Sequence, residues 1–182
     1  EGAVSRFLLL VGMLLAMAAP AAARPASDAE IAALEQRIAS FDAAMRDGDY
    51  AAIVTVIPPP VLERIADDAK VPVDQLEAGL AGQMEEILKT VTLVSFGTEL
   101  EAAEHRELAD GTPYLLIPTE TVMEAEGMGR MKVESFTLAM LDGGNWYLVR
   151  TGDAAMVGIL RQVYPQFTGV AFPADSTTPL GE

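Results

Sequence analysis

The chain has 182 residues, a formal net charge of −15 and no cysteine. Its length suits one ordinary domain, and its acidity argues against binding to nucleic acid or to an anionic membrane surface. Disulfides are excluded, and the usual zinc sites cannot be built with His105 as the single histidine. The calcium-loop, phosphate-loop and common hydrolase motifs are absent as well, so we expect no metal and no cofactor.

The chain begins with a segment typical of a cleavable export signal. Basic Arg6 precedes an apolar run over residues 7–19, and the small-residue segment 20–23 follows. Together, residues 7–23 form an apolar segment of about 17 residues. This segment is shorter than the roughly 20 residues that a spanning helix needs. We therefore predict cleavage between Ala23 and Arg24, no stable membrane anchor, and a periplasmic or secreted protein.

The first half of the mature chain has the pattern of helices. Ser27 and Glu30 form a capping-box pattern, and apolar residues then recur at steps of three and four until the turn at residues 47–49. Prolines mark later boundaries, because they stop a helix or open one. The other expected helices cover residues 50–56, a segment after the prolines at 58–60, and residues 72–89.

The second half changes to the alternating pattern of strands. Turn signals at residues 110–111, 127–129 and 142–145 divide it into an antiparallel meander. The expected strands cover residues 91–108, with a bend or bulge at Gly97, then 113–125, 130–141 and 145–151. Asp153 is expected to cap a short last helix. The segment after Gly169 shows no period and is predicted to be a loose tail.

This order predicts an α+β domain, with N-terminal helices packed on a curved four-stranded antiparallel sheet and a short C-terminal helix. Four stretches resemble small secreted bacterial proteins of unknown function with an NTF2-like (cystatin-like) fold. They are residues 41–58 with Arg-Asp-Gly-Asp-Tyr at 46–50, 116–119, 135–149 with Asp-Gly-Gly-Asn-Trp-Tyr at 142–147, and 160–167 with Tyr-Pro at 164–165.

The resemblance covers about residues 29–167 and implies a fold more than a function, because this fold hosts enzymes, carriers and assembly modules. The expected organisation is a signal peptide over residues 1–23, one domain over 24–167 and a flexible tail over 168–182. In NTF2-like enzymes a carboxylate or histidine base works with tyrosines in the cone between sheet and helices. The resemblance therefore directs attention to that space.

Strand 113–125 has apolar residues on both faces. Alternation places Leu115, Ile117, Thr119, Thr121 and Met123 on one side and Tyr114, Leu116, Pro118, Glu120, Val122 and Glu124 on the other. A sheet with a single packed layer should show one plainly polar side. We therefore predict that something covers the second face, and that the protein forms a homodimer through its sheet or binds a partner there.

Five residues are candidates for a ligand pocket: Tyr114, Glu120, Met123, Glu134 and Trp146. His105, flanked by Glu104 and Arg106, is expected on the solvent-facing side of its strand. The favoured interpretation is a non-catalytic module of the cell envelope that binds a small apolar molecule or an envelope protein. An acid–base enzyme, resembling isomerases or dehydratases, is the alternative, and it requires Glu120 or Glu134 inside an apolar cavity beside a tyrosine hydroxyl. A purely structural module for dimerisation or docking is a third interpretation.

Overall fold

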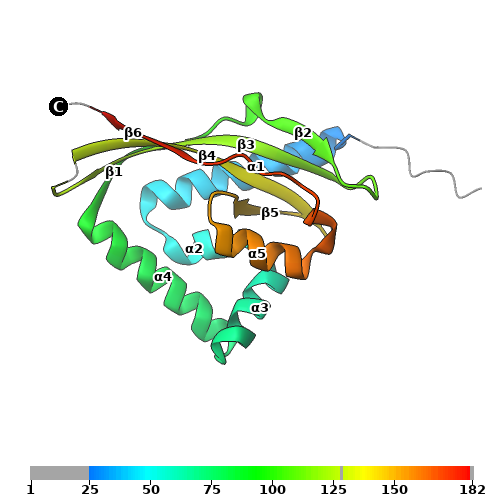
Figure 1. Cartoon of the computed structure of the whole chain (residues 1–182), viewed down its shortest axis with the longest axis horizontal. Coiled ribbons are helices and arrows are strands. Elements are labelled where there is room, and N and C mark those ends of the chain that lie inside the picture. Colours follow the sequence, from blue (N-terminus) through cyan, green and yellow to red (C-terminus); the bar gives the residue numbers. More distant parts are fainter. Residues whose placement is uncertain (1–24, 128, 181–182) are drawn as a thin grey trace, which may run out of the picture.

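The computed structural model describes residues 25–127 and 129–180. Helices and a curled antiparallel sheet form an α+β fold, as the sequence predicts (Figure 1). The export signal and its cleavage point at Ala23 and Arg24 lie outside the described residues. Within the described part of the chain, no helix is both long and apolar enough to cross a membrane.

The four N-terminal helices begin and end at the punctuation residues of the sequence. At the start of α1, the Ser27 side chain accepts a hydrogen bond from the Glu30 backbone N–H, and the Glu30 carboxylate accepts one from the Ser27 N–H. Gly48 ends the helix in a left-handed conformation with φ 68°. The Asp49 side chain caps α2. The bounds are Asp28–Asp47 for α1, Tyr50–Val54 for α2, Pro59–Ala69 for α3 and Val73–Thr90 for α4.

The sheet has a main path of four antiparallel strands in the order β1-β3-β4-β5. Two short strands add to it, because β2 also pairs with β3 and β6 also pairs with β4. The predicted turns all lie between strands, and Gly111, Gly127, Gly143 and Gly144 have positive φ. The bounds are Val91–Thr98 for β1, Glu104–Glu107 for β2, Pro113–Ala125 for β3, Gly129–Asp142 for β4, Asn145–Arg150 for β5 and Ser176–Leu180 for β6.

The predicted long first strand is in fact two strands. A 3₁₀ turn at Leu100–Ala102 separates β1 from β2, and both pair with β3. The register shift in β1 lies between Leu93 and Ser95, whereas Gly97 pairs in register with Glu120. The placement of the bulge at Gly97 is therefore wrong, because the sequence gives no sign that Val94 is the extra residue.

The C-terminal segment contains a strand that the sequence did not predict. After α5 (Ala154–Val163), the chain returns along the sheet and β6 pairs with β4 from Glu134 to Arg130. Arg161 holds this return by donating to the Phe167 and Val170 carbonyls, at 3.4 and 2.8 Å. The prediction of a loose tail is thus wrong for Ser176–Leu180. The signal was missed because edge pairing with a distant strand leaves no local period.

The outer face of the sheet is covered at one end by the chain itself. Tyr114, Leu116, Leu138 and Met140 are buried there against Leu160, Tyr164 and Phe167, which belong to α5 and the segment after it. The Tyr164 hydroxyl donates to Asp142 at 2.7 Å, and burial followed by this contact raises the pKa of Tyr164. Intramolecular packing thus accounts for the apolar residues on both faces of β3. The homodimer stays a prediction, but the apolar residues on both faces of β3 no longer support it.

The inner face of the sheet is packed tightly at one end, which we call the packed end. Leu34 and Ile38 of α1 are buried against five sheet residues, Leu115, Ile117, Ala139, Trp146 and Leu148. The Trp146 indole N–H donates to the Glu30 carbonyl at 2.7 Å, so it also fixes the start of α1 on the sheet. At the other end of the same face, the helices do not close onto the strands.

Candidate functional site: a cavity between the sheet and α4

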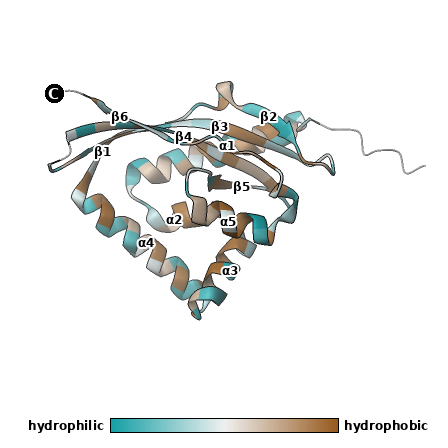
Figure 2. Ribbon diagram, viewed as in Figure 1, coloured by the Kyte–Doolittle hydropathy of each residue, from teal (hydrophilic) through white to brown (hydrophobic). Residues whose placement is uncertain are grey.

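Helix α4 stands away from the sheet although it carries an apolar stripe. This 18-residue helix, about 27 Å long, follows directly into β1 at one end and contacts α3 at the other. It therefore runs from the edge of the sheet, at β1, to α3 (Figure 1). None of its residues is buried, and Ile87 is 54% exposed. Figure 2 shows hydrophobic residues recurring along this helix.

A cavity of about 440 Å³ lies between α4 and the inner face of the sheet. Its walls come from α1, α2, α4, β1, β3, β4, β5 and the start of α5, and most of the lining side chains are apolar. Phe41 and Phe96 form one wall, with ring centroids 5.5 Å apart in an edge-to-face contact. Other walls include Leu80 and Met84 from α4, Leu93 from β1, and Met123 and Val133 from β3 and β4. We call this region the cavity end of the inner face.

Hydroxyl groups form the floor of the cavity. Thr119, Ser135 and Thr137 lie on the inner face of β3 and β4, and each is less than a tenth exposed. The Oγ1 atoms of Thr119 and Thr137 are 2.9 Å apart. Ser135 Oγ lies 3.5 Å from the Thr119 carbonyl oxygen. A small polar floor beneath apolar walls is typical of sites for small molecules, where a few polar groups fix orientation.

The charged residues of the cavity are already engaged. The Arg150 guanidinium donates to the Asp175 carboxylate at 3.0 Å, and its side chain is 62% exposed. The Asp153 carboxylate accepts from the Ala155 and Met156 N–H groups at the start of α5. Among the described lining residues, these are the two that carry charge. Both are bound to structural partners, so neither is a ready acid or base for chemistry.

Asp42 is a half-buried carboxylate close to this region but does not line the cavity. Its two oxygens accept from the Thr98 hydroxyl at 3.2 and 3.1 Å. Burial raises the pKa of Asp42, while the Thr98 hydrogen bond and then the charge of Arg46 oppose this shift. This group joins α1 to β1 next to the phenylalanine wall.

Met123 is the one predicted pocket residue that lines the cavity. Tyr114 lies on the outer face, where its ring contacts Phe167 at 5.6 Å between centroids. Trp146 belongs to the packed end and is 4% exposed. Both aromatic residues therefore stabilise the fold, at positions that contribute no wall to the cavity.

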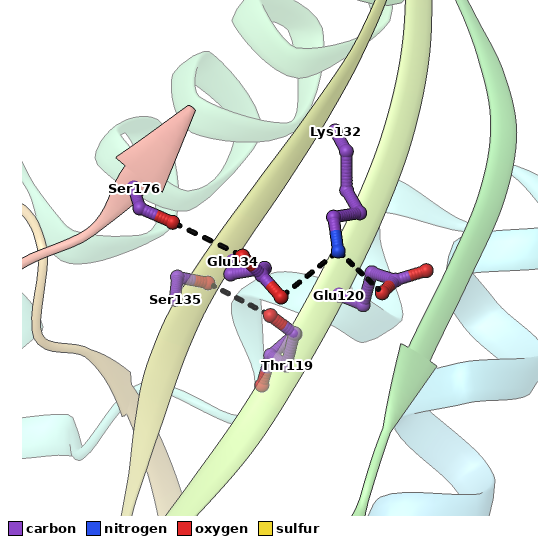
Figure 3. Close-up of polar contacts among 6 residues, drawn as sticks. All are labelled: Thr119, Glu120, Lys132, Glu134, Ser135 and Ser176. Atoms are coloured by element: carbon purple, nitrogen blue, oxygen red, sulfur yellow. Dashed lines mark hydrogen bonds and ion pairs between the residues drawn. The ribbon is translucent and has the colours of Figure 1, made fainter. Parts of the chain in front are cut away.

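Glu120 and Glu134 lie on the outer face with Lys132 between them. The Lys132 ammonium is 2.9 Å from Glu134 and 3.6 Å from Glu120, and the Ser176 hydroxyl donates to Glu134 (Figure 3). The Lys132 hydrogen bond is the main cause that lowers the pKa of Glu134. Both carboxylates are about half exposed, at 46% and 54% of their side-chain surface. The structure thus does not bring them together with a tyrosine in an apolar cavity.

The cavity hydroxyls were present in the sequence but were not singled out. Thr119 and Thr121 stand on the face with Leu115 and Ile117. On β4, Ser135 lies opposite Thr119 and Thr137 lies opposite Ile117. Four small hydroxyl residues on one face of two neighbouring strands interrupt an otherwise apolar face. This pattern is the signal that could have located the floor.

His105 lies on β2 and is exposed, as expected. Over residues 25–127 and 129–180, no cluster of histidine and acidic side chains is arranged to hold a metal ion. No protein-family model, curated protein or solved structure matches this chain. The cavity is therefore the feature of the described chain that points to a function.

Proposed function

We propose that the protein is a non-catalytic binding module that holds a small, mostly apolar molecule in the cavity between α4 and the sheet. The observation that carries the proposal is the apolar stripe of α4, which borders the cavity and contains no fully buried residue although the helix also contacts α2. Exposing such a stripe to water costs free energy, and a bound apolar molecule recovers part of it.

The size of the cavity supports a small-molecule ligand. Small-molecule pockets have volumes of about 300–1,000 Å³ and mainly hydrophobic walls, and a cavity of about 440 Å³ falls within this range. The half-buried methionines Met45, Met84 and Met156 among the lining residues supply flexible side chains that adapt to different ligand shapes.

The acid–base alternative has less support. The described cavity lining contains no tyrosine, and its carboxylate, Asp153, caps a helix. Glu120 and Glu134 are exposed and paired with Lys132. An enzyme of the isomerase or dehydratase kind needs a base inside its pocket, in reach of the reacting proton.

The compartment and the family belong to the same proposal. The export-signal pattern before Arg24 supports a periplasmic or secreted protein. The order of four helices followed by a curved antiparallel meander supports the resemblance to the NTF2-like fold. In this setting we propose a carrier of the cell envelope, one that keeps an apolar molecule out of water.

Native mass spectrometry of the gently purified protein tests this function, because it reports oligomer mass and retained ligand together. We expect extra mass that disappears on denaturation. The paired variants are Ser135→Leu, which fills the cavity floor, and Thr92→Leu, which places the same leucine side chain at an exposed position of β1.

The retained mass should be lost in Ser135→Leu and kept in Thr92→Leu. If added apolar compounds bind equally to both variants, they do not use the cavity and the proposal is wrong. A wild-type protein that carries no ligand and takes up none of those compounds also contradicts it, and would leave a docking module as the better account.

A further inference from the structure

The cavity floor has hydrogen-bonding capacity that the protein itself does not use. A threonine hydroxyl has one proton to donate and two lone pairs to accept with. Thr119 Oγ1 has two partners, Thr137 Oγ1 at 2.9 Å and the Ile117 carbonyl at 3.3 Å. Thr137 Oγ1 has only Thr119. If Thr119 donates to Thr137, the Thr137 proton is left over; if Thr137 donates, both of its lone pairs are left over.

A ligand hydroxyl matches both arrangements of this pair. Thr137 is 8% exposed and lines the cavity, so its unused capacity points to a space with apolar walls. A buried hydroxyl proton or lone pair that is left unused in such surroundings is unfavourable. A hydroxyl both donates and accepts, and therefore completes the pair whichever threonine holds the shared proton.

The electrostatics of the cavity oppose an anionic ligand. Arg150 is the one cation among its described lining residues, and Asp175 balances its charge. Asp153 adds a negative charge beside it, and the whole chain carries −15. Arg150 stands opposite Thr137 in the strand register, but it is already paired with Asp175. A carboxylate on the hydroxyl floor would therefore meet no unpaired cation, which is unfavourable.

We infer that the ligand is a neutral, mostly apolar molecule with a hydroxyl group, and that this hydroxyl binds Thr137 and Thr119. The inference depends on the proposed function of the cavity and adds the chemical class of its ligand. It distinguishes neutral alcohols from fatty acids of the same chain length, because the two differ only in the group that would meet the floor.

Displacement of the neutral fluorescent probe phenylnaphthylamine by decanol and by decanoate, at neutral pH and below micelle-forming concentrations, tests the inference. We expect decanol to bind at least about tenfold more tightly than decanoate. Thr137→Val keeps the shape and removes the hydroxyl, so it should weaken decanol about threefold to tenfold. Thr137→Ser should keep the decanol affinity, and the exposed Thr92→Val is the control that should change nothing.

The affinity of each variant for the probe itself shows whether its cavity is intact, and Thr119→Val replaces Thr137→Val if that protein does not fold. Equal binding of decanoate and decanol overturns the inference but leaves the cavity proposal standing, as does an unchanged decanol affinity in the valine variants. If neither the probe nor decanol binds the wild-type protein, both the inference and the proposed function are wrong.

Discussion

The two ends of the inner sheet face have the same alternating pattern but different environments. At the packed end, Leu115, Ile117 and Ala139 are fully buried under α1. At the cavity end, two to four residues further along the same strands, Thr119, Ser135 and Thr137 face a cavity beneath α4. The difference shows that one face can hold the fold together at one end and keep space for a ligand at the other.

The two covering helices explain the difference. Helix α1 lies on the sheet and buries Leu34, Ile38 and Ala44. Helix α4 has a comparable apolar stripe but joins β1 without a loop, so its path is set by the strand it enters. Its far end contacts α3 and not the sheet. Stability should therefore depend on α1 and ligand binding on α4.

The largest expected effect separates matched leucines on the two helices. Leu34→Ala should lower the free energy of unfolding by about 2–5 kcal/mol, because it empties a fully buried site. Leu80→Ala, at a half-buried position facing the cavity, should cost less than about 1 kcal/mol. Urea unfolding followed by circular dichroism measures both. Equal costs would mean that α4 packs as tightly as α1.

Two substitutions on β4 that enlarge a small side chain also compare the packed end with the cavity end. Ala139→Leu should destabilise the protein by about 1–3 kcal/mol, because the packed end has no room for it. Ser135→Leu should stay within about 0.5 kcal/mol of the wild type, since its added atoms enter the cavity. Thermal unfolding compares the two. A strongly destabilised Ser135→Leu with a harmless Ala139→Leu would invert the assignment of the two ends.

Trp146→Phe tests how the packed end is anchored. The change removes the indole N–H that donates to the Glu30 carbonyl at 2.7 Å, and we expect a loss of about 1–2 kcal/mol. Probe binding at the cavity end should stay unchanged, because Trp146 is not among the lining residues. Full stability would show that this hydrogen bond does not anchor the packed end. Lost probe binding would show that the two ends are not separate.

The smallest expected effect concerns Asp42, between α1 and β1. Because burial raises the pKa of this carboxyl, the folded state binds its proton more tightly than the unfolded state does. Its contribution is therefore fully present below the ordinary carboxyl pKa and is lost as the pH rises through the raised value. Asp42→Asn should remove this loss and leave the variant as stable as the wild type, or slightly more stable, at neutral pH.

Urea unfolding across a pH series checks this sign, with the exposed Glu35→Gln on the same helix as the control for the loss of one negative charge. Relative to that control, the advantage of Asp42→Asn should shrink as the solution becomes acidic. An advantage that grows in acid would mean that the charged form of Asp42 stabilises the fold.

Local signals made much of this fold predictable. The Ser27–Glu30 capping box, the glycine turns and the cap at Asp153 each act within a few residues, so the sequence shows them directly. The fold class followed from the change of period after Lys89. These features determine where elements begin and end.

The cavity was less predictable because it depends on the direction in which α4 leaves the sheet. Leu115 and Ile117 follow the same alternation along β3 as Thr119 and Thr121, so all four side chains point to the inner face. Only the path of a distant helix buries the first pair in the core and leaves the second pair lining the cavity. The same limit applies to β6, whose partner β4 lies more than 40 residues away in the sequence. The sequence shows that Glu120 and Glu134 are polar, but it does not show that they lie on the outer face of the sheet.

Hydrogen exchange of α4 and α1, with and without decanol, tests the central claim most directly. Helix α4 buries no side chain, so its amides should exchange much faster than those of α1 in the ligand-free protein. Decanol should slow exchange in α4 and leave the first half of α1, around Leu34 at the packed end, unchanged. If α4 is as protected as α1 without ligand and decanol has no effect on it, then α4 packs on the sheet in solution and the cavity is not a binding site.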